Sequence, residues 1–148
     1  MIKRMNLFLD NKISNVDCRK IPLVVKDTIL GILNESNSEM VAIYGSYGTE
    51  RQHEDSDIDI AWLPKKDISY MECNRIGNSI AKALKSAGYH IEVDLKTLGS
   101  IYPVCLEEEM MSGTILFSTN NYGIFLANYD ALNYPMLFVT HKGDWYYD

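Results

Sequence analysis

Residues 40–63 read MVAIYGSYGTERQHEDSDIDIAWL, and this stretch decides the fold. Its first five residues are apolar and have the length and β-branched content of a buried strand. That run ends at Gly45-Ser46, and after ten further residues Asp57-Ile58-Asp59 opens a second apolar run that extends through Leu63. The stretch therefore predicts two strands joined by a polar loop.

Asp57 and Asp59 are the first candidates for a functional role. Residues two apart in a strand share a face, so both carboxylates point one way while Ile58 and Ile60 point the other. Two carboxylates side by side at the start of an apolar strand repel each other and cost desolvation. A divalent cation removes both penalties. Hard oxygen ligands on one face suit Mg²⁺, which takes one or two protein carboxylates together with waters and substrate phosphates.

Gly45-Ser46 supplies the other half of a phosphate site. A glycine at the end of a strand lets a ligand approach the backbone closely. A short helix beginning at Ser46 would add free N–H groups and the positive end of its dipole, which together bind anions. Phosphates held here and metal held by Asp57 and Asp59 would make a nucleoside triphosphate site.

The spacing of these groups resembles that of a known family. Gly45-Ser46, ten residues and then Asp57-Ile58-Asp59 is similar to the signature of the nucleotidyltransferase superfamily that includes DNA polymerase beta. The small size resembles its minimal nucleotidyltransferase (MNT) branch, whose members are often antitoxin partners of HEPN-domain RNase toxins. The resemblance implies an α/β (α+β) nucleotidyltransferase fold, in which helices pack on a small mixed sheet.

The same resemblance implies a third carboxylate on the strand that follows the long helix. Asp94 fits that place, where it would hold a second metal ion and ease deprotonation of an acceptor hydroxyl. Glu92 lies on the same face of the expected strand, but the family pattern favours Asp94. The implied catalytic and metal-binding set is therefore Asp57, Asp59 and Asp94, with two Mg²⁺ ions and with ATP as the substrate.

Arg51 is a candidate for contacting the triphosphate, beside Gly45 and Ser46. Many MNT relatives have Ala-Arg-Gly directly after Gly-Ser-x, where this chain has Gly48-Thr49-Glu50. Arg51 is displaced from that place. Two interpretations therefore stay open, a contact to the triphosphate and a solvated loop arginine.

The composition is that of a single soluble globular domain. The chain has 148 residues, of which 47% are hydrophobic and 23% are charged. Its net charge of −6 argues against direct nucleic-acid binding, because phosphate contacts need clustered Lys and Arg. Its three cysteines form no Cys-x-x-Cys pair, and no segment approaches the roughly 20 apolar residues of a membrane span. We therefore expect a cytoplasmic protein that does not bind membranes.

Helices and strands are expected to alternate along the rest of the chain. Ser69-Tyr70-Met71-Glu72 is a capping box that begins a long helix, and Gly88 is placed to end it. A strand follows at 89–95, and strand, long helix, strand with a right-handed crossover is an α/β arrangement. We expect one domain over 1–148, with an N-terminal arm at 1–20 and a C-terminal partner-contact segment at 120–148. The other expected elements are a helix at 22–36, a short helix from Pro103 to Gly113, a strand at 114–118 and a helix at 122–129.

These features lead to one functional expectation and two alternatives. The resemblance implies an antitoxin that transfers AMP from ATP to a tyrosine hydroxyl of a HEPN RNase toxin, and neutralises the toxin by this Mg²⁺-dependent AMPylation. A small-molecule nucleotidyltransferase, such as one that modifies aminoglycosides, usually carries a further helical domain for which this chain has no room. A non-catalytic module that neutralises a toxin by steric cover is the other alternative, and the intact set of glycine, serine and three aspartates argues against it.

Overall fold

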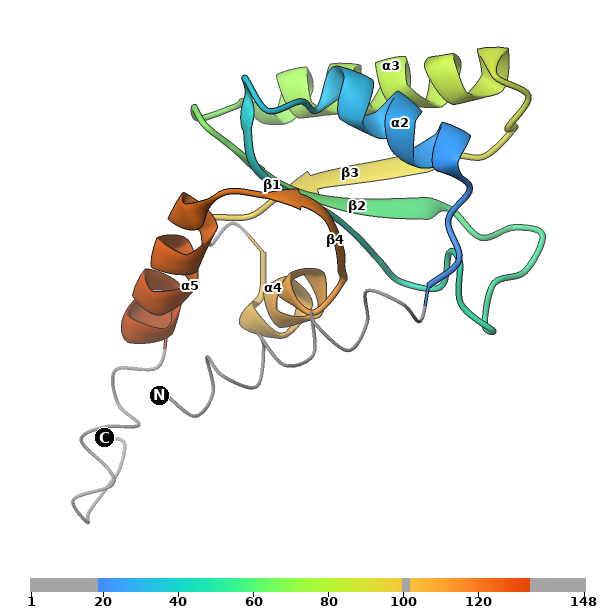
Figure 1. Ribbon diagram of the computed structural model, residues 1–148. Coiled ribbons are helices and arrows are strands. Elements are labelled where there is room, and N and C mark those ends of the chain that lie inside the picture. The colour runs from blue at the N-terminus through green and yellow to red at the C-terminus, as the bar shows by residue number, and fades with distance from the viewer. Residues whose placement is uncertain (1–18, 100–101, 134–148) are drawn as a thin grey trace.

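The computed structural model describes residues 19–99 and 102–133. Within these ranges the strands form one sheet in the order β3-β2-β1-β4 (Figure 1). Strand β1 (Ser38–Tyr44) pairs antiparallel with both β2 (Ile58–Pro64) and β4 (Thr114–Ser118), whereas β3 (Val93–Thr97) pairs parallel with β2. The sheet is therefore small and mixed, as the sequence predicts. The described helices are α2 (Leu23–Ile32), α3 (Tyr70–Ser86), α4 (Val104–Met111) and α5 (Asn120–Asn133).

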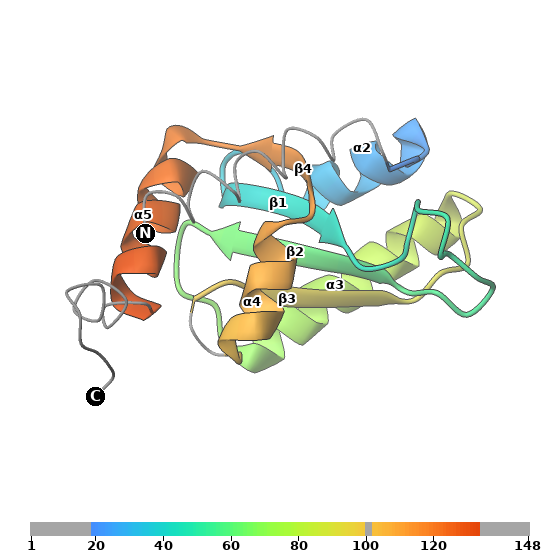
Figure 2. The same ribbon diagram turned by 90° about the horizontal axis from the view of Figure 1, so that it is seen from below.

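Helices cover both faces of the sheet. Figures 1 and 2 show α2 and α3 on one face and α4 on the other, with α5 beside it. On β1, Val41 and Ile43 belong to the core under α2 and α3, while Ala42 and Tyr44 belong to the core on the α4 side. Because both faces of β1 are buried, its residues 40–44 form a continuous apolar sequence rather than an alternating one.

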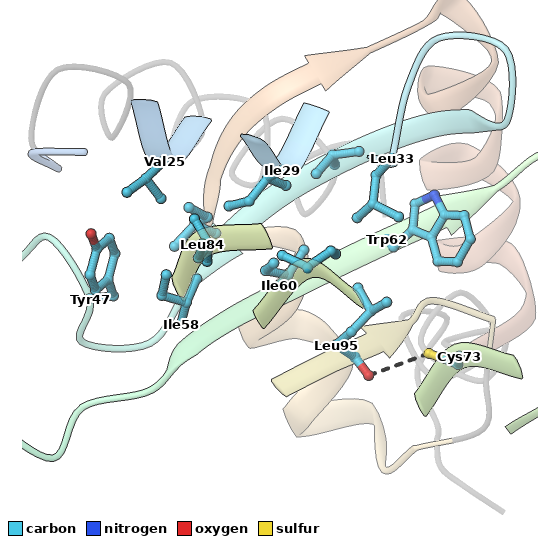
Figure 3. Close-up of a cluster of buried hydrophobic side chains, with 13 residues drawn as sticks. Val25, Ile29, Leu33, Tyr47, Ile58, Ile60, Trp62, Cys73, Leu84 and Leu95 are labelled. Carbon is cyan, nitrogen blue, oxygen red and sulfur yellow. Dashed lines mark hydrogen bonds between the residues drawn. The ribbon is translucent and has the colours of Figure 1, made fainter. Parts of the chain in front are cut away.

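The larger core lies between the sheet and the helices α2 and α3 (Figure 3). Ile29 of α2, Leu84 of α3 and Ile60 of β2 are all fully buried in it. At one end of this core the Trp62 Nε1–H donates a hydrogen bond of 2.8 Å to Ser38 Oγ. That bond satisfies a buried indole donor, so the ring fills the core without an unpaired polar atom.

The long helix α3 begins and ends where the sequence predicts. Ser69 Oγ accepts a hydrogen bond of 3.1 Å from the Glu72 N–H, and Gly88 follows the last turn with φ +97°. The second bond of a capping box is replaced by another contact, because the Glu72 carboxylate pairs with Arg75. The serine cap and the glycine stop therefore set the bounds of α3.

Strand β3 begins later than the strand predicted at 89–95. The Tyr89 N–H donates to Leu84 O at 2.8 Å, and the Ile91 N–H donates to Tyr89 O at 3.1 Å. The first bond joins Tyr89 to the end of α3, and the second forms a turn, so the first residues of the predicted strand lie outside the sheet. The strand then extends to Thr97, because it stays in register with β2 that far.

Other predicted bounds shift at the element ends. The helix predicted at 22–36 is α2, which stops at Ile32 because a turn at Asn34 follows it. The predicted short helix, the strand at 114–118 and the last helix are α4, β4 and α5, respectively. Apart from Arg19 and Lys20, the predicted arm lies outside the described residues, and so do residues 134–148 of the predicted partner-contact segment. None of the helices in the described ranges is long and apolar enough to span a membrane.

Candidate functional site

Tyr44, Asp59 and Asp94 lie in one row across three neighbouring strands. The antiparallel register pairs Tyr44 with Asp59, and the parallel register pairs Asp59 with Asp94. Ile60 and Leu95 are buried in the core under α2 and α3, so alternation along the strands turns the row toward the α4 side. The structure thus brings two of the three candidate carboxylates side by side.

The Asp59 carboxyl lies among other negative charges. Its pKa is raised to about 6, first by burial and next by the negative charge of Asp94. Asp57 and Glu109 add to this rise, and the ammonium of Lys96 opposes it. Carboxylates that repel one another at a partly buried position are stabilised by a bound cation. Asp57 itself is exposed and precedes the first residue of β2.

Gly45 is tied directly to the Asp59 carboxylate. It has φ +75°, and a Cβ built on it would lie 3.2 Å from Asp59 Cγ and closer still to Oδ2. The approach of a ligand to this glycine stays a prediction, and the structure shows that the missing Cβ also makes room for the Asp59 side chain. The glycine therefore allows the carboxylate to lie against the end of β1.

Ser46 opens a series of turns rather than the short helix expected there. Its carbonyl accepts both the N–H and the hydroxyl of Thr49, and Gly48 with φ +79° then takes the chain out of helical geometry. The Ser46 hydroxyl lies 2.9 Å from the hydroxyl of Ser56, across the base of the loop. The expectation of a helix dipole at Ser46 is therefore wrong, and turn backbone takes its place.

A polar cavity of about 440 Å³ opens beside the end of β1. Gly45 and Arg51 line it, so two of the three predicted nucleotide-binding residues meet there, while Ser46 is not part of its lining. Arg19 lines it too, and its side chain donates to Gly45 O and to Thr114 Oγ1. The complete lining is Arg19, Tyr44, Gly45, Thr49, Arg51, Glu109, Ser112, Gly113 and Thr114.

Three charged residues of the site were missed by sequence reasoning. Lys96 forms an ion pair with Asp94, and its position two residues along the same strand face was a signal that could have indicated this pair. Arg19 and Glu109 reach the site from distant parts of the sequence, through the folding of the segment before α2 and of α4. Local spacing carries no signal for either of them.

A second cavity, of about 300 Å³, borders Asp94 on the outer side of the row. Lys96, Thr97 and Tyr102 line it, together with residues of the first turns of α3. Cys73 donates its thiol to Leu95 O at 3.4 Å in the same region. The carboxylate row is thus flanked by a polar cavity on one side and by a more apolar one on the other.

The donor set of the row suits one kind of metal ion. In the ranges that the structure covers, no three His, Cys, Asp or Glu side chains come close enough together to hold a metal ion by themselves. Mg²⁺ does not require such a cage, because it takes one or two carboxylates and completes its octahedral shell with water and phosphate oxygens. The oxygen donors of Asp59 and Asp94 therefore fit Mg²⁺ that is bound together with a nucleotide.

Comparisons with known proteins identify the family of this chain. The family described as "Polymerase beta, Nucleotidyltransferase" matches residues 27–122, more than half of the chain. No curated protein matches. A crystal structure of a toxin–antitoxin with AMP-PNP is 25% identical, with a TM-score of 0.60, over 79% of this chain and 92% of that chain.

Two further solved structures are similar in fold. One is the toxin–antitoxin MntA-HepT, 21% identical with a TM-score of 0.57, over 82% of this chain and 93% of that one. The other is a tri-AMPylated HEPN toxin of Shewanella oneidensis in complex with an MNT antitoxin, 22% identical with a TM-score of 0.56, over 81% of this chain and 92% of that one. The family match, the mixed sheet and the paired aspartates agree: this chain belongs to the polymerase beta nucleotidyltransferase family.

Proposed function

We propose that this chain is an antitoxin nucleotidyltransferase that transfers AMP from ATP to a tyrosine hydroxyl of a HEPN-domain RNase toxin. The observation that carries the proposal is the pairing of Asp59 with Asp94 in register, beside a polar cavity that two arginines line. The family match and the similarity to a toxin–antitoxin structure with AMP-PNP support it. The tri-AMPylated toxin in a structure of similar fold supports the choice of acceptor protein.

The transfer is a single displacement at phosphorus. The tyrosine oxygen attacks the α-phosphorus of ATP and forms a new P–O bond. The bond from the α-phosphorus to the oxygen that bridges to the β-phosphorus breaks, so pyrophosphate leaves with the electron pair. Because little covalent chemistry falls to the protein, its residues act by positioning the reactants and by placing charge.

Different residues of the site would bind the triphosphate and the acceptor hydroxyl. The polar cavity with Gly45, Arg19 and Arg51 is the place we assign to the triphosphate. Asp94 lines the second cavity and not the polar one, so we assign it to the acceptor hydroxyl, whose proton it would help to remove. The tyrosine would then approach from the side of Lys96 and Tyr102, away from the phosphates.

Mg²⁺ is the cofactor we propose for this site. Asp57, Asp59 and Asp94 would hold it, and bound Mg²⁺ would neutralise charge on the transferring and leaving oxygens. A bound cation would also stabilise the carboxylates, because burial and then the repulsion from Asp94 raise the pKa of Asp59.

The test is the intact mass of a purified HEPN toxin after incubation with this protein, ATP and Mg²⁺. A gain of one or more AMP units with the wild-type chain, lost with Asp59→Asn, is the expected result. Asp27→Asn is the matched control, because it removes the same charge from an exposed position on α2. A stable complex without any mass gain would favour neutralisation by steric cover, and the absence of both would refute the pairing with a HEPN toxin.

A further inference from the structure

Arg19 holds the loop that follows β1 through several contacts at once. Its Nη1 donates to the carbonyl oxygens of Gly45 and Tyr47, and its Nε donates to Thr114 Oγ1 at 3.1 Å. The planar guanidinium group offers five N–H donors in a fixed fork, so one side chain can hold two carbonyls and a hydroxyl together. Arg19 therefore joins the loop after β1 to the start of β4.

These contacts fix which way the loop peptides face. In a planar trans peptide the C=O of one residue and the N–H of the next point in opposite directions. With the Tyr47 carbonyl held by Arg19, the Gly48 N–H points away, and it donates to Gln52 Oε1 at 2.7 Å. The same rule, applied to the Gly45 carbonyl, turns the Ser46 N–H away from the guanidinium.

The Ser46 N–H is the next feature of this loop. None of the hydrogen bonds among the described residues uses it, although it lies in a half-buried turn. A backbone N–H without an acceptor among the described residues is a suitable donor for an anionic ligand. Here it lies next to the glycine that lines the polar cavity.

The charge of Arg19 points to the same kind of ligand. Arg19 is half-buried, and it lines the cavity together with Arg51. Burial lowers the pKa of Arg19, and the nearby positive charge of Arg51 lowers it further, while Asp59 has the opposite effect. The contacts to the loop use Nε and Nη1, and Nη2 donates to no described residue. Two neighbouring cations, together with N–H groups that donate to no residue in the described ranges, suit a polyanion.

Arg19 is also held in place along its stem. The Lys20 N–H donates to Gly48 O at 2.8 Å, so the two backbone segments run side by side at this point. A Cβ on Gly48 would lie 2.6 Å from Arg19 Cγ and 2.8 Å from Lys20 O. The Arg19 guanidinium is therefore held in place before a ligand binds, which limits the loss of side-chain entropy on binding.

We propose that Arg19 is a positioning residue for the phosphates of ATP: by holding the Gly45 carbonyl it leaves the Ser46 N–H on the other side of the peptide, available to a phosphate oxygen. This inference rests on the proposed function, since ATP is the polyanion that it assigns to the cavity. It adds a residue from before α2 to a site whose other members come from the strands, the loop and α4.

Binding of AMP-PNP in the presence of Mg²⁺, measured by calorimetry, tests this inference. We expect Arg19→Met to weaken binding about tenfold or more, because hydrogen bonds to charged groups contribute at least that much. Arg19→Lys keeps the charge but cannot form the fork, so it should restore only part of the affinity. The matched control is Lys20→Met, which removes a positive charge from the adjacent exposed residue and should change the affinity less than twofold.

The outcomes separate this inference from the proposed function. If the wild-type protein fails to bind AMP-PNP and to modify the toxin, the proposed function is wrong, and the role of Arg19 falls with it. If the wild type binds and Arg19→Met binds equally well while melting at a lower temperature, Arg19 only stabilises the fold. Full rescue by Arg19→Lys would also overturn the inference, since charge alone would then explain the effect.

Discussion

Replacing Gly45 by alanine should damage the site more than it damages the fold. The residue has φ +75°, and alanine pays about 1–2 kcal/mol to adopt such a left-handed conformation. The new methyl group would also overlap the Asp59 carboxylate, and relief of such overpacking costs about 1–3 kcal/mol more. We therefore expect Gly45→Ala to lower the free energy of unfolding by about 2–5 kcal/mol in total.

Gly88→Ala is the matched control for this change. Gly88 has φ +97°, so alanine meets a similar backbone penalty there, but nothing lies within 4 Å of the Cβ position. We expect a loss of about 1–2 kcal/mol, which for a chain of this size lowers the melting temperature by about 2–8 °C. The comparison separates the cost of positive φ from the cost of moving Asp59.

The assay is AMP transfer to the toxin, measured at a temperature where both variants are folded. Relief of the overlap in Gly45→Ala must displace the Asp59 carboxylate, and a displacement of about 1 Å at a catalytic group lowers the rate about a hundredfold. Gly88→Ala should transfer AMP at the wild-type rate. Equal stability losses in the two variants, with transfer intact in both, would refute the argument that Gly45 makes room for Asp59.

Further predictions concern the stability of the protein without ligands. The pKa of Asp59 is about 6 in the folded state instead of 3.8, so the folded state binds the proton of this carboxyl more tightly than the unfolded state does. The stability that protonation contributes is therefore present below pH 3.8 and lost as the pH rises through 6. Asp59→Asn should therefore raise the free energy of unfolding in EDTA at pH 8 by about 1–2 kcal/mol, a value that allows for solvent screening. Thermal scans at pH 8 and pH 4 should show this gain in stability only at pH 8. Leu84→Ala removes a fully buried side chain from the larger core and should cost about 2–5 kcal/mol in urea titrations, whereas a cost below 1 kcal/mol would mean that α3 packs loosely.

The sequence predicts the parts of this structure that depend on local pattern. The apolar period, the Ser69 cap and the stop at Gly88 place α3 correctly, and the continuous apolar run at 40–44 marks a strand buried on both faces. The spacing of Asp57 and Asp59 places Asp59 on the face of β2 opposite to Ile58 and Ile60. Local pattern was sufficient wherever neighbours in the sequence are also neighbours in space.

The parts that pattern reasoning missed depend on contacts between distant segments. The first residues of the predicted strand at 89–95 alternate in hydrophobicity, yet Tyr89 is hydrogen-bonded to the end of α3 and a turn at Tyr89–Ile91 follows, so these residues lie outside the sheet. Arg19 has no motif around it, and only the fold brings it to Gly45 and Thr114. The helix expected at Ser46 failed because Gly48 and Thr49 favour a turn, a choice that strand–loop spacing does not specify.

The hydrogen bond between the hydroxyls of Ser46 and Ser56 joins the two ends of the loop between β1 and β2. Beyond that contact the segment 52–55 is exposed, so residues inserted there would lengthen a loop whose ends are already joined. Doubling the length of a flexible loop costs only about 0.6 kcal/mol. Related chains can therefore vary the length and charge of this tip, and with them the surface that they present to a partner, while the carboxylate row keeps its geometry.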